Sequence, residues 1–402
     1  MGHLYKTNYI AFFAIFIEIL MMMRCWIGFG GMQNAFQYVL FLILFVSWHQ
    51  GALTMRFKEK YLVFALLVLF YLLYTQRNLT NIGKDLYRLV FAANIFLILS
   101  IHDCAKKELF SFIVKWFGIL MIPGLLLFAV SIVHGLPLIN SIYGEYEGGT
   151  LTNYLFSNYF FFLYSHESTG RFNGPFIEPG DLGCMASFML LAARFQFKRY
   201  KYLWAIFVAL LASQSLAGYL LTAFGFVICI YYNGRLSLRN AIGICIGIIC
   251  IYLFANFYND GDNFLQEKIF SRLESDEEKG IAGNNRNSDI MTLYFYEMFN
   301  NPRTLCFGYD KNTINIIQES GTGAGAISKI ISFGLLGFLW LCVPFWIIYR
   351  KSSNRGFAFA FFLFFLLYLI QRTDAFWLGF ILCYVYGIEM YEMDRQKQTV
   401  NK

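Results

Sequence analysis

One short stretch ahead of an apolar segment carries an unusual set of chemically capable residues. Residues 171–183 combine one arginine, two carboxylates, two prolines and three glycines. Charged groups and rigid turns at a membrane surface are costly unless they are used. We therefore predict a site in which Arg171 faces a phosphate and a carboxylate, Glu178 or Asp181, acts as a base. The alternative is a turn in which Pro179 opens a helix and Asp181 caps it.

Other candidate anion-binding groups lie elsewhere in the chain. Arg286 stands just before a predicted helix at 288–299, where a guanidinium and a helix N-terminus are two positive sources. The glycine-rich run at 320–326 precedes an apolar segment, and its backbone N–H groups can cradle a phosphate. The alternative for Arg286 is a solvated loop arginine without a ligand. The alternative for the glycine-rich run is that its glycines allow tight helix packing.

Two further arginines, Arg88 and Arg372, stand at the ends of apolar segments with Asp85 and Asp374 close by in sequence. Ion pairs at a membrane interface explain both without a function, so we keep them as second-rank ligands for pyrophosphate. The nine cysteines form no CxxC pair and no cluster with histidine. The sequence therefore predicts no metal site and no cofactor.

These residues are embedded in a strongly apolar chain. Of its 402 residues 58% are hydrophobic and only 14% are charged, against about a quarter charged in soluble domains. A membrane-spanning helix needs roughly 20 mostly apolar residues. We predict an all-α, polytopic membrane protein with about 12 transmembrane helices. The predicted spans are 8–23, 36–50, 61–75, 87–101, 113–133, 181–197, 201–214, 216–232, 241–257, 327–349, 356–371 and 375–391. The division at Ser213-Gln214-Ser215 is the weakest of these boundaries.

Lysine and arginine in the short loops predict the orientation. Basic residues gather in the loops at 51–60, 104–108, 194–201, 233–240 and 350–355, which fall on one side together with both termini. By the positive-inside rule that side is the cytoplasm. The net charge of +7 then reflects topology and anionic lipid, so nucleic acid is not an expected partner.

This topology leaves two long loops outside the cytoplasm and divides the chain into five parts. The parts are helices 1–5 (1–133), the first long loop (134–180), helices 6–9 (181–257), the second long loop (258–326), and helices 10–12 with a cytoplasmic tail (327–402). The aromatic run 154–164 in the first loop is too short to span, so we expect it to lie in the interface or to dip in and return. In the second loop, Ser288 or Asn287 caps the predicted helix and Asn301-Pro302 ends it.

Taken together, these motifs resemble the family of bacterial O-antigen polymerases and ligases. The resemblance rests on the run from Arg171 to Pro179, the Ser213-Gln214-Ser215 junction, the long loop with Arg286, and the Gly334-Leu-Leu-Gly337 opening of a span. Ligases of the family usually carry a histidine a little over ten residues before that glycine pair, and this chain has none there. The departure favours a polymerase over a ligase.

The resemblance implies a glycosyltransferase of the bacterial inner membrane, active at the periplasmic face. Its substrates would be oligosaccharide repeats on undecaprenyl pyrophosphate, and its partners would be membrane lipid and a chain-length regulator protein. Glu178 is the first choice for the base, with Asp181, Asp289 and His166 behind it. A lipid-linked oligosaccharide transporter is the competing class, but such transporters usually show two similar halves, which this chain does not.

Overall fold

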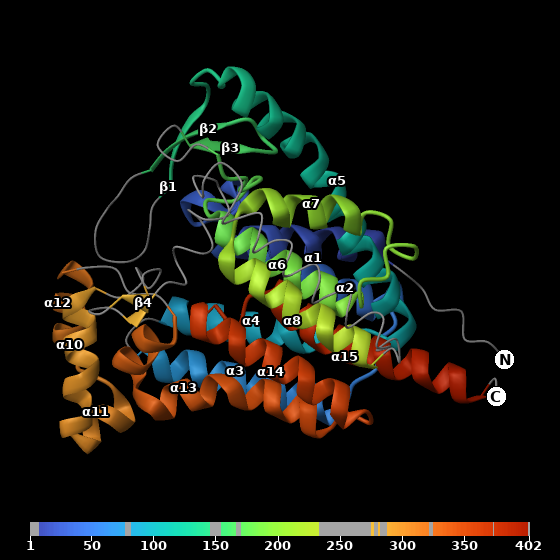
Figure 1. Cartoon of the computed structure of the whole chain (residues 1–402). Helices are drawn as coiled ribbons and strands as arrows, with labels where there is room; N and C mark the ends of the chain where they lie inside the picture. Colours follow the sequence, from blue (N-terminus) through green and yellow to red (C-terminus); the bar gives the residue numbers. More distant parts are fainter. Residues whose placement is uncertain are drawn as a thin grey trace.

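The structure is a computed structural model that describes residues 8–76, 82–144, 154–165, 170–232, 275–276, 280–281, 288–320, 325–372 and 374–400. This part of the chain is mostly helical (Figure 1). The helices of its first half are α1 (Tyr9–Met22), η1 (Trp26–Gly31), α2 (Met32–His49), α3 (Glu59–Gln76), α4 (Ile82–Leu99), α5 (Asp103–His134), α6 (Pro179–Ala192), α7 (Leu203–Ser213) and α8 (Leu216–Tyr232). Those of its second half are α10 (Asp289–Glu297), η5 (Met298–Asn300), α11 (Pro302–Phe307), α12 (Lys311–Ser320), α13 (Ala326–Arg350), α14 (Arg355–Gln371) and α15 (Leu378–Val400).

Helices occupy eleven of the twelve predicted spans, and the span at 241–257 lies outside the described residues. Of the described helices, α5 and α13 are long and apolar enough to cross a membrane, and α1, α6, α7, α8 and α14 are shorter apolar helices. The predicted helical character is confirmed. That all twelve segments cross a membrane stays a prediction.

The break between α7 and α8 lies at the predicted junction. Gln214 ends α7 with a left-handed backbone, φ 50°, and α8 begins two residues later. A left-handed residue cannot continue a right-handed helix, which explains the separation of two apolar segments that follow each other so closely.

Two predictions about helix boundaries were wrong. The segment 104–108, predicted as a loop, belongs to α5, which begins at Asp103 because the His102 side chain accepts a hydrogen bond from the backbone N–H of Cys104. Likewise α15 continues beyond the predicted end of the span at 391. In both cases polar residues extend an apolar helix, and hydropathy alone does not detect such an extension.

The first long loop contains a small sheet that the helical prediction missed. Its strands are β1 (Ser141–Gly144), β2 (Tyr154–Asn158) and β3 (Leu163–Ser165). In the second long loop, β4 (Ser275–Asp276) and β5 (Gly280–Ile281) form a separate two-stranded sheet. Both ladders of the first sheet are antiparallel, with Ser157 opposite Ser141 and Tyr164. The aromatic run 154–164 is therefore a β-hairpin, and its β-propensity outweighs any tendency to form a re-entrant helix.

Helix α6 is the central element of the bundle. Every residue from Gly180 to Ala192 is buried, and the Phe188 ring lies 4.8 Å from that of Phe380 in α15. Glycine allows α8 to approach closely, since a Cβ atom on Gly218 would lie 3.0 Å from the backbone of Gly183. The N-terminal end of α6, which carries Glu178 and Asp181, is thus held firmly by its neighbours.

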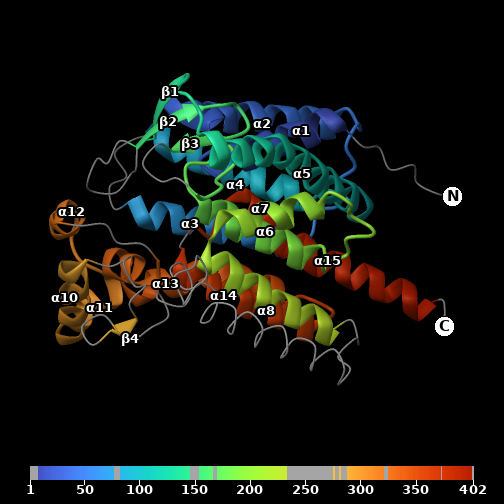
Figure 2. The same ribbon diagram turned by 45° about the horizontal axis from the view of Figure 1, so that its top comes forward.

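The described parts of both long loops lie at the same end of the helical bundle. The sheet β1–β3 and the helices α10, α11 and α12 are at the left of Figure 1, whereas the two termini are at the right. Figure 2, turned by 45°, shows the same separation. We call the end with the loops the outer end and the end with the termini the inner end.

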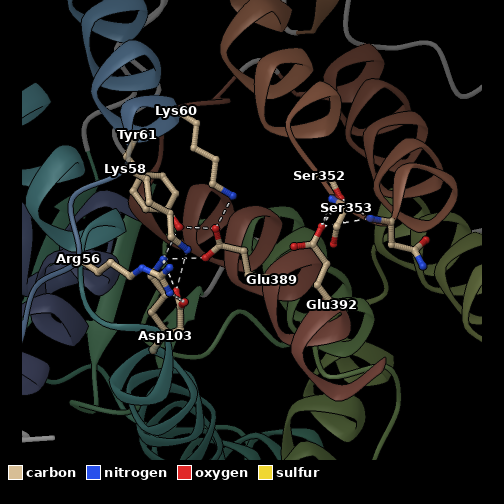
Figure 3. A network of polar contacts seen from close by, with 11 residues as sticks. Arg56, Lys58, Lys60, Tyr61, Asp103, Ser352, Ser353, Glu389 and Glu392 are labelled. Atoms are coloured by element: carbon tan, nitrogen blue, oxygen red, sulfur yellow. Dashed lines mark hydrogen bonds and ion pairs between the residues drawn. The ribbon is translucent and has the colours of Figure 1, made fainter. Parts of the chain in front are cut away.

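A dense group of charges fixes the inner end of α15 (Figure 3). This inner charge cluster consists of Arg56, Lys58, Lys60, Tyr61, Asp103, Lys106 and Glu389. The Glu389 carboxylate accepts hydrogen bonds from Lys106 at 2.7 Å and from Tyr61, and Lys60 lies 2.7 Å from it. Because these partners come from α3 and α5, the cluster ties three helices together.

Candidate functional site

A second group of charges lies at the outer end, where α6 begins. This outer charge cluster consists of Arg24, Glu178, Asp181, Arg372 and Asp374. Its residues come from the link between α1 and η1, the start of α6, and the connection from α14 to α15. Three segments that are far apart in sequence thus meet at one point.

The start of α6 places the two acids that the sequence singled out. Pro179 occupies the first turn, as predicted, where its missing N–H costs nothing. The prediction that Asp181 caps this helix was wrong. Glu178 holds the capping position without a side-chain cap hydrogen bond, and Asp181 lies inside the first turn. Both carboxylates are directed instead to arginines from other segments.

Arg372 binds both acids at once. Its Nη1 donates to Asp181 Oδ1 and its Nη2 donates to Glu178 Oε2, so the planar guanidinium forks between two carboxylates. Gly180 is required for this approach, because a Cβ atom there would collide with Nη2 of Arg372. The sequence neighbour Asp374 was the expected partner of Arg372, and that pairing was wrong.

Asp374 pairs with Arg24, a residue that the sequence argument missed. Arg24 lies 3.8 Å from Asp374, 3.3 Å from Glu178 and 3.9 Å from Asp181. Burial would lower the pKa of Arg24, but Asp181, Asp374 and Glu178 outweigh it and raise that pKa above its usual value. Arg24 therefore carries its charge throughout the accessible pH range.

A signal for Arg24 was present in the sequence. It is a cation directly after the first apolar span, on the side that the positive-inside rule leaves poor in basic residues. Its backbone is left-handed, with φ 57°, and its guanidinium lies 5.6 Å from the centre of the Trp377 ring. The backbone conformation and the contact with Trp377 together fix the direction in which the Arg24 guanidinium points.

The five side chains differ in their access to solvent. The Asp181 side chain is fully buried and that of Arg372 is 9% exposed, whereas Glu178 is 16% and Arg24 is 36% exposed. Asp181 Oδ2 and Arg372 Nε are buried without a hydrogen-bond partner. Glu178 and Arg24 can therefore touch a ligand, while Asp181 and Arg372 position them.

Both arginines of the cluster are already paired with carboxylates. Arg24 and Arg372 contact the three acids, and Lys329 of α13 also interacts electrostatically with Asp374. A partly exposed carboxylate in such a group can accept a proton or bind a sugar hydroxyl. Among the described residues, no group of three or more His, Cys, Asp or Glu side chains is placed to hold a metal ion.

Arg171 occupies a different place from the acids. It donates from Nε to the backbone oxygen of Ser213 and from Nη2 to that of Gln214, both at 3.3 Å. A cation at the carboxyl end of α7 is favourable because the carbonyl groups there are unpaired. Arg171 thus joins the first long loop to the α7–α8 break.

The remaining candidates are distributed over other parts of the molecule. Arg88 pairs with Asp85 at 3.0 Å within α4, the ion pair weighed above as the alternative. Asp289 lies in the first turn of α10, which Ser288 caps as predicted, and Asn301 ends η5 as expected. Arg286 and His166 lie outside the described residues.

Comparison of the chain with known protein families, with curated proteins and with solved structures finds no match.

Proposed function

We propose that the chain is a metal-independent polysaccharide polymerase of the bacterial inner membrane, with twelve spans and both termini in the cytoplasm. It would join oligosaccharide repeats carried on undecaprenyl pyrophosphate into O-antigen or a similar surface polysaccharide. In the reaction an acceptor hydroxyl oxygen attacks the anomeric carbon of the donor. The bond from that carbon to the pyrophosphate breaks, the leaving group keeps the electron pair, and a carboxylate takes the hydroxyl proton.

The outer charge cluster is the observation that carries this proposal. Glu178 is the carboxylate best placed as base, because it is partly exposed at the start of α6. Arg24 and Arg372 each contact a different oxygen of its carboxylate, and this fixes the direction of the side chain. Asp181 is fully buried, so its role is to hold Arg372 in place.

The departing pyrophosphate needs cationic stabilisation. Arg24 and Arg372 are already paired with carboxylates, so we assign this role first to Arg171 and Arg286. Arg88 stays a second-rank ligand, and Arg372 contributes mainly through Glu178. Arginine suits the task because its planar fork binds phosphate in a bidentate way.

Deletion of the gene followed by a gel of the surface lipopolysaccharide tests the proposal. Loss of a polymerase leaves core with a single repeat, because one repeat can still be ligated. Loss of an O-antigen ligase leaves bare core. Loss of a lipid-linked oligosaccharide transporter also leaves bare core, with single repeats retained on the inner face. A deletion strain with long chains or bare core would contradict the polymerase assignment.

The arginines can be tested in the same strain. We expect Arg171→Ala and Arg286→Ala each to remove long chains, since a lost charge-assisted contact costs about 2–4 kcal/mol, or roughly a hundredfold in rate. Arg303→Ala, which alters an exposed arginine at the start of α11, is the matched control. A normal ladder from either test variant, with the protein present in the membrane, would remove that arginine from the site.

A further inference from the structure

An open cleft lies beside the outer charge cluster, between η1 and the sheet of the first long loop. Its volume is about 650 Å³, within the roughly 300–1,000 Å³ range of small-molecule sites. It is lined by three aromatic residues, two amides, one serine and one aliphatic residue: Trp26, Tyr159, Phe160, Asn140, Asn158, Ser141 and Ile139. None of these groups carries a charge at neutral pH, in contrast to the neighbouring cluster.

The backbone around the cleft is held in an unfavourable conformation. Phe160 has φ 69° and Asn140 has φ 43°, and a left-handed backbone is rare for a residue as bulky as phenylalanine. Two contacts enforce it: the Trp26 indole N–H donates to the Phe160 carbonyl at 2.7 Å, and the Asn158 side chain accepts from the Phe160 N–H at 2.8 Å. The result is a phenylalanine ring that is 55% exposed and lies 5.0 Å from Trp26.

The Phe160 ring packs edge-on against Trp26 and Phe161, and its exposed part is available to stack on a ligand in the cleft. The chemistry of the lining fits an uncharged sugar. Aromatic rings stack on the apolar C–H face of a sugar, while amides both donate to and accept from its hydroxyls. A lipid chain would leave Asn140, Asn158 and Ser141 without polar partners, which is unfavourable.

The cleft is also connected directly to the candidate base. Trp26 follows Arg24 by two residues, and its backbone N–H donates to Pro175 at 3.3 Å. Ile177, next to Glu178, donates in turn to the Arg24 carbonyl at 3.4 Å. A glycan held in the cleft therefore has one end near the outer charge cluster.

We infer that this cleft is a binding site for neutral sugar residues of the glycan that the enzyme elongates. The inference rests on the proposed function and adds a substrate-binding element to it. The bound sugars would orient the glycan so that its terminal residue meets Glu178. No bond is made or broken in the cleft itself.

Glycine variants provide a test that preserves the backbone. Glycine adopts positive φ without strain, so Phe160→Gly and Asn140→Gly remove the side chain and leave the loop conformation accessible. The control is Phe299→Ala, which removes a ring of similar exposure, 57%, from η5. The full chain would be placed in lipid nanodiscs and titrated calorimetrically with a lipid-free repeat unit, released by mild acid from its acid-labile glycosyl pyrophosphate carrier.

We expect the wild type and Phe299→Ala to bind the repeat unit equally, and each cleft variant to bind it about tenfold more weakly or worse. Equal binding by wild type and both cleft variants would overturn the inference, as would a wild type that does not bind the repeat unit at all. Size-exclusion profiles check that the variants are folded. The deletion gel tests the polymerase assignment separately, since it does not depend on sugar affinity.

Discussion

The outer and inner charge clusters use the same residue types at opposite ends of the bundle. In the inner cluster each oxygen of Glu389 has a cation at 2.7 Å, and Lys106 and Glu389 are 1% and 4% exposed. In the outer cluster two polar atoms lack a hydrogen-bond partner, and Arg24 is 36% exposed. The inner cluster, whose charged groups are fully paired, holds helices together. The outer cluster has polar atoms without a hydrogen-bond partner and a partly exposed arginine, so one of its ion pairs can be exchanged for a contact with a ligand.

The two clusters also differ in their balance of charge. Four cations face two carboxylates at the inner end, and this excess of cations matches the positive-inside rule. At the outer end three carboxylates face Arg24, Arg372 and the nearby Lys329, so the described residues there have no excess of cations.

The largest effect is expected at the inner end. Lys106→Met leaves Glu389 buried with one cation fewer, and breaking a buried ion pair costs about 3–5 kcal/mol of stability. We expect a marked fall in the temperature at which the protein aggregates in mild detergent, with Lys351→Met, an exposed residue of the same end, as control. Unchanged thermal behaviour of Lys106→Met would mean that this cluster does not fasten α15.

Glu178→Gln should instead lower activity by roughly a hundredfold or more, the usual contribution of a general base. Glu297→Gln, at the exposed end of α10, should leave the ladder of long chains unchanged. The measurement is chain polymerisation in the deletion strain, normalised to the amount of protein in the membrane. If the polymerisation rate of Glu178→Gln still falls at low pH as it does in the wild type, Glu178 is not the base and only orients the arginines.

A smaller effect with a defined pH dependence is expected at Asp394, beyond the predicted end of the last span. Burial raises the pKa of Asp394, but the hydrogen bond from Lys107, 3.0 Å long, and the charge of Arg194 outweigh it and lower that pKa. A lowered carboxyl pKa adds stability above the unfolded value of about 3.9, and this stability disappears as pH falls through the folded value.

Asp394→Asn should therefore be less stable than the wild type by about 2 kcal/mol at neutral pH, the range of hydrogen bonds to a charged group. The two proteins should converge below about pH 4. Thermal stability in detergent, measured at several pH values, checks this. A difference that persists unchanged into acid would show that the carboxylate charge is not the cause.

The smallest effect is expected for Arg88→Gln. An i,i+3 pair such as Arg88 with Asp85 contributes only about 0.2–0.5 kcal/mol to a helix. The ion-pair interpretation predicts a normal ladder and nearly normal stability. A loss of long chains as severe as that of Glu178→Gln would place Arg88 among the pyrophosphate ligands.

Features that depend on neighbouring residues could be predicted from the amino-acid sequence. Apolar runs predicted the helices, Pro179 the start of α6, Ser288 the start of α10, and the Ser213-Gln214-Ser215 junction the break between α7 and α8. These features follow from hydropathy, backbone preference and capping, all of which act within a few residues. The same local signals brought Glu178 and Asp181 forward as candidates.

The pairing of the charged residues, in contrast, depends on how the helices pack. Arg372 reaches Glu178 across 194 positions and Arg24 reaches it across 154, whereas sequence proximity had paired Arg372 with Asp374. The contact of the first long loop with Trp26, which forms the cleft, is also non-local, because the Trp26 indole donates to Phe160 across 134 positions. Helix packing brings such residues together, and no pattern along the chain records the distance between helices that are far apart in sequence.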